Sequence, residues 1–313
     1  MMIPYIPVYL FSGFLDCGKT TFVKEFLDGL QSSSPSKVLL ICCEQGEEEY
    51  DCDELYKNDV ILKYIEDECS FTYDNILNLI RETSADKVVV EFNGMWKALL
   101  PHSIWEKDQL METLIIDTET FEVYLSNLKA IIADKIRIAD LILFGRCNVD
   151  DDKIAYYRRS VKALNSNANV IFRNDNGDVN IDYVSFLPYD YTEDHINISD
   201  DVFAAFYIDA TENPDRYKGK TVSFTAMVLN PGKDKKGSFI AGRLALTCCS
   251  EDLSVFGFIC DAENTDDLEI KDWFTIKARM EVEHSDKYGI DHPVCKVIDM
   301  QRCDAPAREV VGV

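Results

Sequence analysis

A glycine-framed segment near the start of the chain, GFLDCGKT at residues 13–20, matches the pattern GxxxxGK[ST] in full. An apolar run at residues 5–12 precedes it and predicts a strand, and an amphipathic run at residues 20–30 follows and predicts a helix. Glycines let successive backbone N–H groups turn toward one anion, and the start of a helix adds positive potential. In this context the segment predicts a loop that binds the phosphates of a nucleoside triphosphate.

The polar residues of this loop have separate expected roles. We expect the Lys19 ammonium to contact the β- and γ-phosphates and the Thr20 hydroxyl to bind Mg²⁺. The flanking strand and helix argue against a chance match. The other loop residues that we expect to contact the nucleotide are Gly13, Asp16, Cys17, Gly18 and Thr21.

The apolar run KVVVEF at residues 87–92 contains one acidic residue, Glu91, next to its end. A carboxylate at the carboxyl end of a sheet strand lies near a phosphate loop, so we expect Glu91 to act on Mg²⁺ or its waters. Gly94 follows three residues later, and we expect its backbone N–H to sense the γ-phosphate. The alternative is a surface strand that simply ends in glutamate.

Short apolar runs alternate with amphipathic ones up to residue 172. The apolar runs predict strands at 5–12, 38–43, 87–92, 113–117, 140–144 and 169–172. The amphipathic runs predict helices at 20–30, 72–83, 119–137 and 151–165. This alternation is typical of a mainly parallel sheet with helices on both faces. We predict an α/β P-loop nucleotide-binding domain over residues 1–175.

The pattern changes after about residue 175. Residues 176–201 are polar and contain Pro and Gly, which predicts a linker. Residues 202–313 predict a small all-β domain, an antiparallel barrel or sandwich. The expected strands of this domain lie at 202–208, 221–229, 237–249, 255–261, 273–283 and 294–300.

The net charge of −24 over 313 residues argues against non-specific binding to nucleic acid or to anionic membranes. No apolar run approaches the roughly 20 residues that span a bilayer, and no signal peptide is evident. We therefore expect a cytoplasmic protein that does not itself span a membrane. Its eleven cysteines are then expected to be mostly thiols.

An acidic stretch at residues 44–54 contains seven acids and no basic residue. A solvated loop is the simplest interpretation. Cys42 and Cys43 precede Glu44, however, and carboxylates with thiols suit a borderline metal such as Zn²⁺. Both interpretations stay open.

Taken together, these segments resemble the CobW-like GTPases, relatives of the HypB and UreG metal-centre maturation proteins. The resemblance covers about residues 5–175, and it implies a GTP-binding switch that handles a metal. In this resemblance Glu91 and Gly94 take the Walker B and switch II positions. The segments that carry it, in order, are YLFSGFLDCGKTTF, CCEQGEEEYD, VVVEFNGM, LIIDTETF, IRIADLILF and VKALNSNANVIF.

The chain departs from this family at its metal motif. The family carries GCxCC before the helix that precedes Walker B, whereas residues 67–71 read DECSF and offer only the thiol of Cys69. Cys69 with Glu68, Cys42 and Cys43 is the substitute zinc or other transition-metal site that the sequence allows.

The chain also departs from the guanine-reading motif NKxD, which appears as GRCN at residues 145–148. Arg146 and Asn148 are the expected base-side residues. A neutral Asn accepts the two N–H bonds of guanine less well than Asp, and Gly145 offers no side-chain amide. The resemblance favours GTP, and these substitutions leave ATP open.

Residues 205–304 resemble the soluble domain of YcgQ-like proteins, which accompany a predicted permease. The resemblance implies an OB-like fold, and it rests on Tyr217-Lys218-Gly219-Lys220, Arg243, Cys248-Cys249 and Asp272-Trp273-Phe274. Cys248 and Cys249 are either buried strand residues or a pair of metal ligands. Possible helpers are Asp261, His284 and Cys295, whereas His102 and His195 are expected to be surface or core residues.

Two functions remain in view. The first is a slow nucleotide-hydrolysing switch that handles a metal for a metalloprotein client, with Glu44 or Glu91 as the general base. The second is a non-hydrolysing adaptor that docks on a membrane permease. A small-molecule kinase is less favoured, because its Arg-rich lid has no counterpart beyond Arg158-Arg159.

Overall fold

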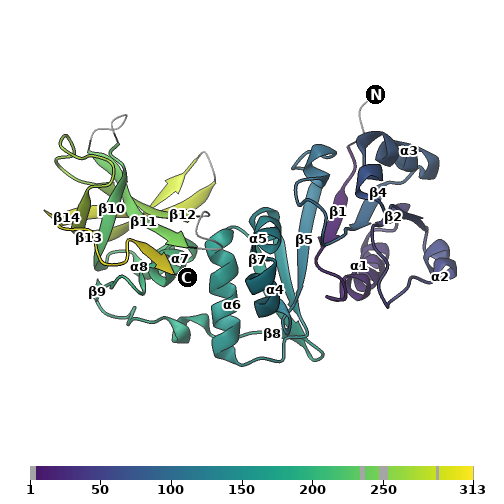
Figure 1. The fold of residues 1–313 in the computed structure, drawn as a ribbon, viewed down its shortest axis with the longest axis horizontal. Helices are drawn as coiled ribbons and strands as arrows, with labels where there is room; N and C mark the ends of the chain where they lie inside the picture. Colours follow the sequence, from purple (N-terminus) through teal and green to yellow (C-terminus); the bar gives the residue numbers. More distant parts are fainter. Residues whose placement is uncertain (1–4, 233–236, 247–252, 287–288, 313) are drawn as a thin grey trace. The chain divides into compact units, whose positions relative to one another are not determined.

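A computed structural model describes residues 5–232, 237–246, 253–286 and 289–312. The chain divides into two compact units. The first comprises residues 1–150 and 167–180, and the second comprises residues 151–166 and 181–313. Figure 1 shows their helices and strands. No helix formed by the described residues is long and apolar enough to cross a membrane.

The first unit is built on an eight-stranded sheet in the order β3-β2-β4-β1-β5-β6-β7-β8. All neighbouring strands run parallel except β7 and β8, which form an antiparallel pair at one edge. Central strands such as β2 are buried along their whole length, as expected when helices cover both faces. The strands are β1 (Val8–Ser12), β2 (Val38–Cys42), β3 (Val60–Tyr64), β4 (Lys87–Glu91), β5 (Leu110–Asp117), β6 (Leu141–Gly145), β7 (Asn169–Asn174) and β8 (Gly177–Val179).

Helices cover this sheet from both sides. The apolar stripe of α1 joins a core with one set of strand residues, and that of α3 joins a core with the alternate set. Each stripe recurs at helical spacing, and Thr72 caps the start of α3 by accepting from Asn75 N at 3.4 Å. The helices are α1 (Lys19–Ser33), α2 (Cys52–Lys57), α3 (Tyr73–Thr83), α4 (Phe121–Asn127) and α5 (Lys129–Ile138), with 3-10 turns η1 (Glu68–Ser70) and η2 (Pro101–Ser103).

The predicted parallel sheet with helices on both faces is confirmed. Two details differ from the expectation. The expected helix 119–137 is divided into α4 and α5 at Leu128, whose backbone torsions (φ −124°, ψ 33°) depart from helical values. Strand β3 and helix α2 lie in a stretch for which the apolar pattern predicted no element.

The second unit contains a closed ring of five strands, in which β10, β11, β12, β14 and β13 pair in turn and β13 pairs back to β10. The predicted small all-β barrel is thereby confirmed. Strand β9 extends the sheet beside β10, and β15 extends it beside β11. Its elements are α6 (Asp151–Leu164), η3 (Tyr183–Phe186), β9 (His195–Asn197), α7 (Phe203–Glu212), α8 (Pro214–Tyr217), β10 (Thr221–Asn230), β11 (Ser238–Leu246), β12 (Leu253–Asp261), β13 (Trp273–Ser285), β14 (Ile290–Arg302) and β15 (Val310–Gly312).

The prediction of a strand at residues 202–208 is wrong, because these residues begin helix α7. Phe203 and Phe206 pack on the barrel residues Phe224 and Phe258, with ring centroids 5.4–6.5 Å apart. A helix buried this deeply has no clear polar face, and a short apolar run cannot then be told from a strand by its periodicity.

Arg243 is fully buried in the barrel and holds the end of the chain. Its guanidinium donates to the main-chain oxygens of Glu309 (3.3 Å) and Arg308, and it forms an ion pair with Asp200. It also lies over the ring of Trp273, 5.1 Å from the ring centre. The side chain therefore joins β11 to the segment before β15.

We predict that Arg243→Leu lowers the free energy of unfolding by about 2–3 kcal/mol, because buried carbonyl groups lose a charged donor. Arg279→Leu is the matched control on the same barrel. Arg279 is exposed and pairs with Glu281 at 3.2 Å, so its loss should cost less than about 1 kcal/mol. Urea denaturation of both variants measures the two changes in the free energy of unfolding. Equal changes would show that the buried contacts of Arg243 do not stabilise the barrel more than the exposed pair of Arg279.

Candidate functional site

The loop between β1 and α1 has the backbone shape that its glycines allow. Gly13 has φ 149° and Gly18 has φ 95°, values that favour glycine, and Asp16 between them is left-handed at φ 61°. A Cβ on Gly13 would lie 2.3 Å from the carbonyl oxygen of Ile115 in β5. The loop is thus pressed against the sheet where only glycine fits.

Lys19 begins α1, and its side chain folds back over the loop. The ammonium donates to the carbonyl oxygens of Gly13 at 3.0 Å and Phe14 at 2.8 Å, and it forms an ion pair with Glu44. The residue is only 3% exposed. Glu44 follows β2, so the acidic loop brings a carboxylate to the same ammonium that the motif assigns to phosphate.

Glu91 lies at the end of β4, 2% exposed, beside the start of α1. The Thr20 hydroxyl donates to Glu91 Oε1 at 2.8 Å, and the Tyr50 hydroxyl donates to Glu91 Oε2. Burial raises the pKa of Glu91 above its ordinary value, while the bonds from Tyr50 and Thr20 act in the opposite direction. A buried carboxylate of this kind is a favourable partner for a cation.

The donor set around this point fits Mg²⁺. One hydroxyl and one carboxylate, Thr20 and Glu91, lie within hydrogen-bond reach of each other, and hard oxygen donors are what Mg²⁺ prefers. Both side chains line a cavity of about 350 Å³. Its lining comprises Leu15, Asp16, Gly18, Lys19, Thr20, Thr21, Glu44, Gly46, Glu47, Glu48, Glu91 and Arg146.

Gly94 lies directly on the phosphate loop. A Cβ at this position would be 2.2 Å from the carbonyl oxygen of Gly13 and 2.7 Å from Phe14 Cα. Contacts this short with backbone atoms cannot be relieved by a side-chain rotation. The turn after β4 and the loop after β1 therefore fit together only through glycine, and a shift in one must move the other.

Arg146 links the segment after β6 to the same loop. Its guanidinium donates to the carbonyl oxygen of Asp16 at 2.6 Å and to Asp117 Oδ2 at 2.7 Å. It borders the first cavity and a second of about 410 Å³, whose lining also includes Gly18, Thr21, Phe22, Asn174 and Asp175. Asn148, the other expected base-side residue, is exposed and lines neither of these two described cavities.

The cysteines considered for zinc do not come together. Cys42 joins the core on the α1 side of the sheet, and Cys43 joins the core on the α3 side. Burial raises the pKa of Cys42 to about 12 and that of Cys43 well above its ordinary value, whereas Cys69 is exposed on η1. The expected grouping of Cys42, Cys43, Glu44 and Cys69 is therefore not formed.

More generally, no group of three His, Cys, Asp or Glu side chains suited to a metal occurs among residues 5–232, 237–246, 253–286 and 289–312. Cys248 and Cys249 lie outside the described residues. Two of the possible helpers are ion-paired, Asp261 with Lys296 at 2.6 Å and His284 with Asp291 at 2.7 Å. Cys295 is buried inside the barrel.

Other residues singled out in the sequence have structural partners. His102 contacts Glu112 Oε2 at 3.2 Å, and His195 contacts Ser223 Oγ at 2.8 Å. Arg158, considered for a kinase lid, forms an ion pair with Glu212 of α7 at 2.8 Å. In the second unit Tyr217 is buried and donates to Asp209.

Two residues of the site were missed by the sequence reasoning. Tyr50 is the one aromatic residue within the acidic stretch 44–54, and an isolated aromatic in so polar a segment was the available signal. Asp117 ends β5 at the same edge of the sheet as Glu91, and the rule that carboxyl ends of parallel strands meet could have indicated it.

Two family descriptions match the chain. Residues 7–172, more than half of the chain, match the CobW/HypB/UreG nucleotide-binding domain, and residues 177–311 match the DUF1980 C-terminal domain. No curated protein sequence matches the chain.

Solved structures that are similar to this one include two HypB proteins and FlhF. HypB from Archaeoglobus fulgidus is 15% identical over 54% of this chain and 81% of its own, with a TM-score of 0.40. HypB from Helicobacter pylori in complex with nickel is 15% identical over 58% and 82%, with a TM-score of 0.36. FlhF complexed with GMPPNP and Mg²⁺ is 12% identical over 58% and 72%, with a TM-score of 0.38.

Proposed function

This chain belongs to the CobW/HypB/UreG family of nucleotide-binding domains, and we propose that it is a magnesium-dependent, slow GTPase switch that takes part in metal handling. One observation supports the proposal above others. Lys19 lies beside Glu44 and Thr20 beside Glu91, so that the residues proposed to bind the triphosphate adjoin those proposed to bind Mg²⁺. A magnesium–triphosphate complex needs both at once.

In this proposal the triphosphate replaces Glu44 as the partner of Lys19. The loop amides between Gly13 and Thr21 hold the phosphate oxygens, and Thr20 and Glu91 hold Mg²⁺ or its waters. Mg²⁺ when bound supplies charge neutralisation at the phosphates. Glu44, once displaced, stays near the γ-phosphate and is the candidate that orients the attacking water.

The family favours GTP, and Arg146 lies between the phosphate cavity and the second cavity, where a base would be held. The family's acid is replaced by Asn148, a neutral residue that accepts the N–H bonds of guanine less well and lines neither of these two cavities. We therefore expect GTP to bind more tightly than ATP, with less discrimination than an Asp would give.

Glu44→Gln separates the two roles proposed for this residue. We predict that nucleotide affinity rises about 3- to 10-fold, because a competing carboxylate loses its charge beside Lys19. Phosphate release should fall, because the amide cannot accept a proton from water. Calorimetry and single-turnover phosphate release measure the two effects. An unchanged rate would remove Glu44 from the water-orienting role.

Phosphate release from GTP and from ATP, with Mg²⁺ and then with EDTA, tests the proposed activity. We expect slow release from GTP that requires Mg²⁺ and disappears in Lys19→Ala. Equal release from the wild type and this variant would eliminate hydrolysis. Metal analysis of the protein with and without a non-hydrolysable GTP analogue then tests coupling to zinc or another transition metal.

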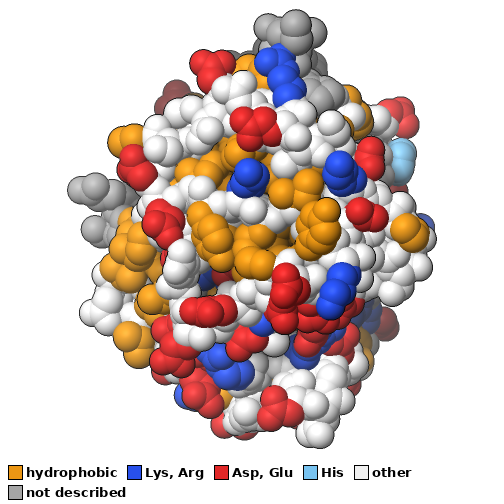
Figure 2. All heavy atoms as spheres, turned by 90° about the vertical axis from the view of Figure 1, so that its right-hand side faces the viewer, with side chains coloured by type: hydrophobic (Ala, Val, Ile, Leu, Met, Phe, Trp, Pro, Cys, Tyr) orange, Lys and Arg blue, Asp and Glu red, His pale blue; other side chains and the backbone are white. Residues whose placement is uncertain are grey.

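Exposed hydrophobic side chains support a second function, a nucleotide-binding adaptor for a membrane permease. Figure 2 shows the side of the molecule on which α2 and α3 lie in Figure 1, with hydrophobic side chains near its centre and acidic ones around and below them. Tyr56 is 79% exposed and Tyr64 is 48% exposed in this unit. Tight GTP binding without turnover, together with co-purification of a membrane protein, would favour this function.

A further inference from the structure

The side chain of Tyr50 ties the acidic loop after β2 to the end of β4. Tyr50 is buried, and its hydroxyl donates to Oε2 of Glu91, 41 residues away along the chain. Thr20 donates to the other oxygen, Oε1, at 2.8 Å. The carboxylate thus has one donor on each oxygen, and the two donors come from different elements.

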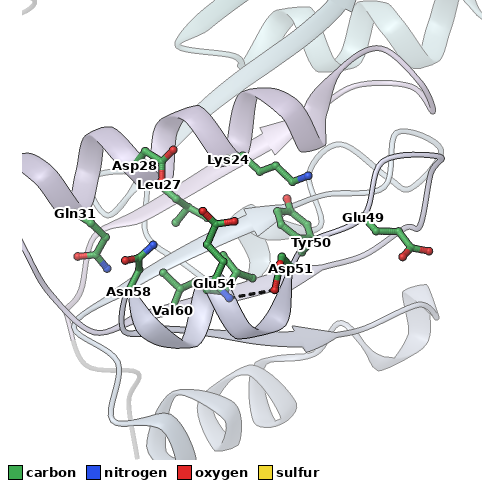
Figure 3. Close-up of a pocket in the computed structure, with 11 residues that line it drawn as sticks. Lys24, Leu27, Asp28, Gln31, Glu49, Tyr50, Asp51, Glu54, Asn58 and Val60 are labelled. Atoms are coloured by element: carbon green, nitrogen blue, oxygen red, sulfur yellow. Dashed lines mark hydrogen bonds between the residues drawn. The ribbon is translucent and has the colours of Figure 1, made fainter.

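The ring of Tyr50 is held independently of its hydroxyl. Figure 3 shows Tyr50 in the wall of a cavity of about 200 Å³ between α1 and α2. The ammonium of Lys24 lies 5.8 Å from the ring centre, and Leu27 and Val60 supply apolar contacts nearby. The ring position is therefore fixed by packing, and the hydroxyl is directed at Glu91 as a result.

The backbone that carries Tyr50 is also fixed. Asp51, the next residue, caps α2 by accepting from the amides of Asp53 at 2.9 Å and Glu54 at 3.1 Å. On the other side of the loop, Glu44 pairs with Lys19. Tyr50 is thus the fixed end of a loop whose other end meets the phosphate site.

The two donors on Glu91 would have different roles when Mg²⁺ binds, and this step rests on the proposed function. The Thr20 hydroxyl would offer an oxygen lone pair to the ion, and its hydrogen could still be donated to Oε1. The Tyr50 hydroxyl bonds the opposite oxygen, Oε2, and would not contact the ion.

We propose that Tyr50 is a positioning residue that holds the Glu91 carboxylate, through Oε2, in the orientation that presents Oε1 to Mg²⁺. The residue does not touch the nucleotide. It acts through Glu91. Because Tyr50 belongs to the acidic loop, its bond to Glu91 also couples the conformation of this loop to cation binding beside Glu91. Without this bond the carboxylate can rotate, and its metal-facing geometry is no longer set before the ion arrives.

Tyr50→Phe tests the proposal, because it removes the hydroxyl and keeps the ring that packs against α1. We expect the Mg²⁺ concentration for half-maximal GTP binding, measured by calorimetry, to rise about 10-fold. Nucleotide affinity in EDTA should change less than about 2-fold, since the phosphate loop is untouched. Tyr56→Phe, an exposed tyrosine on α2, is the matched control and should behave as the wild type.

A double-mutant cycle with Glu91→Gln shows whether Tyr50 acts through Glu91. The effects of the two substitutions on Mg²⁺ dependence should be strongly non-additive. Additive effects, or an unchanged Mg²⁺ dependence in Tyr50→Phe with the wild type binding normally, would overturn the inference alone. A wild type that binds no magnesium–nucleotide would instead overturn the proposed function. A Tyr50→Phe protein that only melts earlier, with wild-type Mg²⁺ dependence, would make the bond merely structural.

Discussion

Lys19→Ala is expected to abolish measurable GTP hydrolysis and to weaken nucleotide binding by at least about 30-fold. Removing one partner of a buried, hydrogen-bonded charge pair costs roughly 2–5 kcal/mol, and in the bound state that partner is the triphosphate. Lys19 is 3% exposed and already lies on the loop carbonyls of Gly13 and Phe14. Arg146, another cation that lines this cavity, donates instead to the Asp16 carbonyl oxygen and to Asp117.

Lys24→Ala is the matched control for this loss. Lys24 lies on the same helix and is more exposed. It pairs with Glu48 of the acidic loop, whereas Lys19 donates to the glycine-framed loop. Its removal should change nucleotide affinity less than about 3-fold, because exposed ion pairs contribute little. Fluorescence titration with a labelled GTP analogue measures both variants. Similar losses in the two would mean that general charge, rather than the phosphate loop, holds the nucleotide.

Gly94→Ala should reduce phosphate release by about 100-fold, because misplacing a catalytic element by about 1 Å costs that much. The added Cβ would lie 2.2 Å from the Gly13 carbonyl oxygen, and Gly13 itself lies so close to β5 that a Cβ there would be 2.3 Å from the Ile115 carbonyl oxygen. One or both loops must therefore move. We also expect the free energy of unfolding to fall by about 1–3 kcal/mol from overpacking.

Gly29→Ala provides the contrast. Gly29 lies on α1, and a Cβ there meets no atom within 4 Å. The substitution should stabilise the protein by about 0.5–1 kcal/mol through helix propensity and leave phosphate release unchanged. Stopped-flow phosphate release and urea denaturation measure both variants. A Gly94→Ala protein with wild-type activity would show that the contact between the two loops is unimportant.

Much of the first unit could be predicted from sequence because its signals are local. The strand–loop–helix context of residues 13–20 and the apolar runs set the parallel sheet, and the family resemblance is confirmed by the match over residues 7–172. Strand β3 was missed because Val60–Tyr64 is a short edge strand interrupted by Lys63, which weakens the apolar signal. The match over residues 177–311 likewise confirms the second resemblance.

The predicted thiol site relied on cysteines that are close in sequence, and the structure does not bring their side chains together. Adjacent residues at the end of a strand point to opposite faces, so Cys42 and Cys43 belong to different cores. The alternation of faces along a strand is itself a sequence rule, and it could have indicated this separation. Tyr50 could not be found in the same way, because its bond to Glu91 depends on how a loop folds back across 41 residues.

We propose that the glycine-framed loop, with its neighbours Lys19, Thr20 and Glu91, binds a magnesium–nucleotide complex. Isothermal titration of the folded wild type with GTP in excess Mg²⁺ measures this binding. We expect saturable binding of one nucleotide per chain, weakened by EDTA and at least about 30-fold weaker in Lys19→Ala. Folded protein that takes up no magnesium–nucleotide complex, GTP or ATP, would show that the loop is not a nucleotide site.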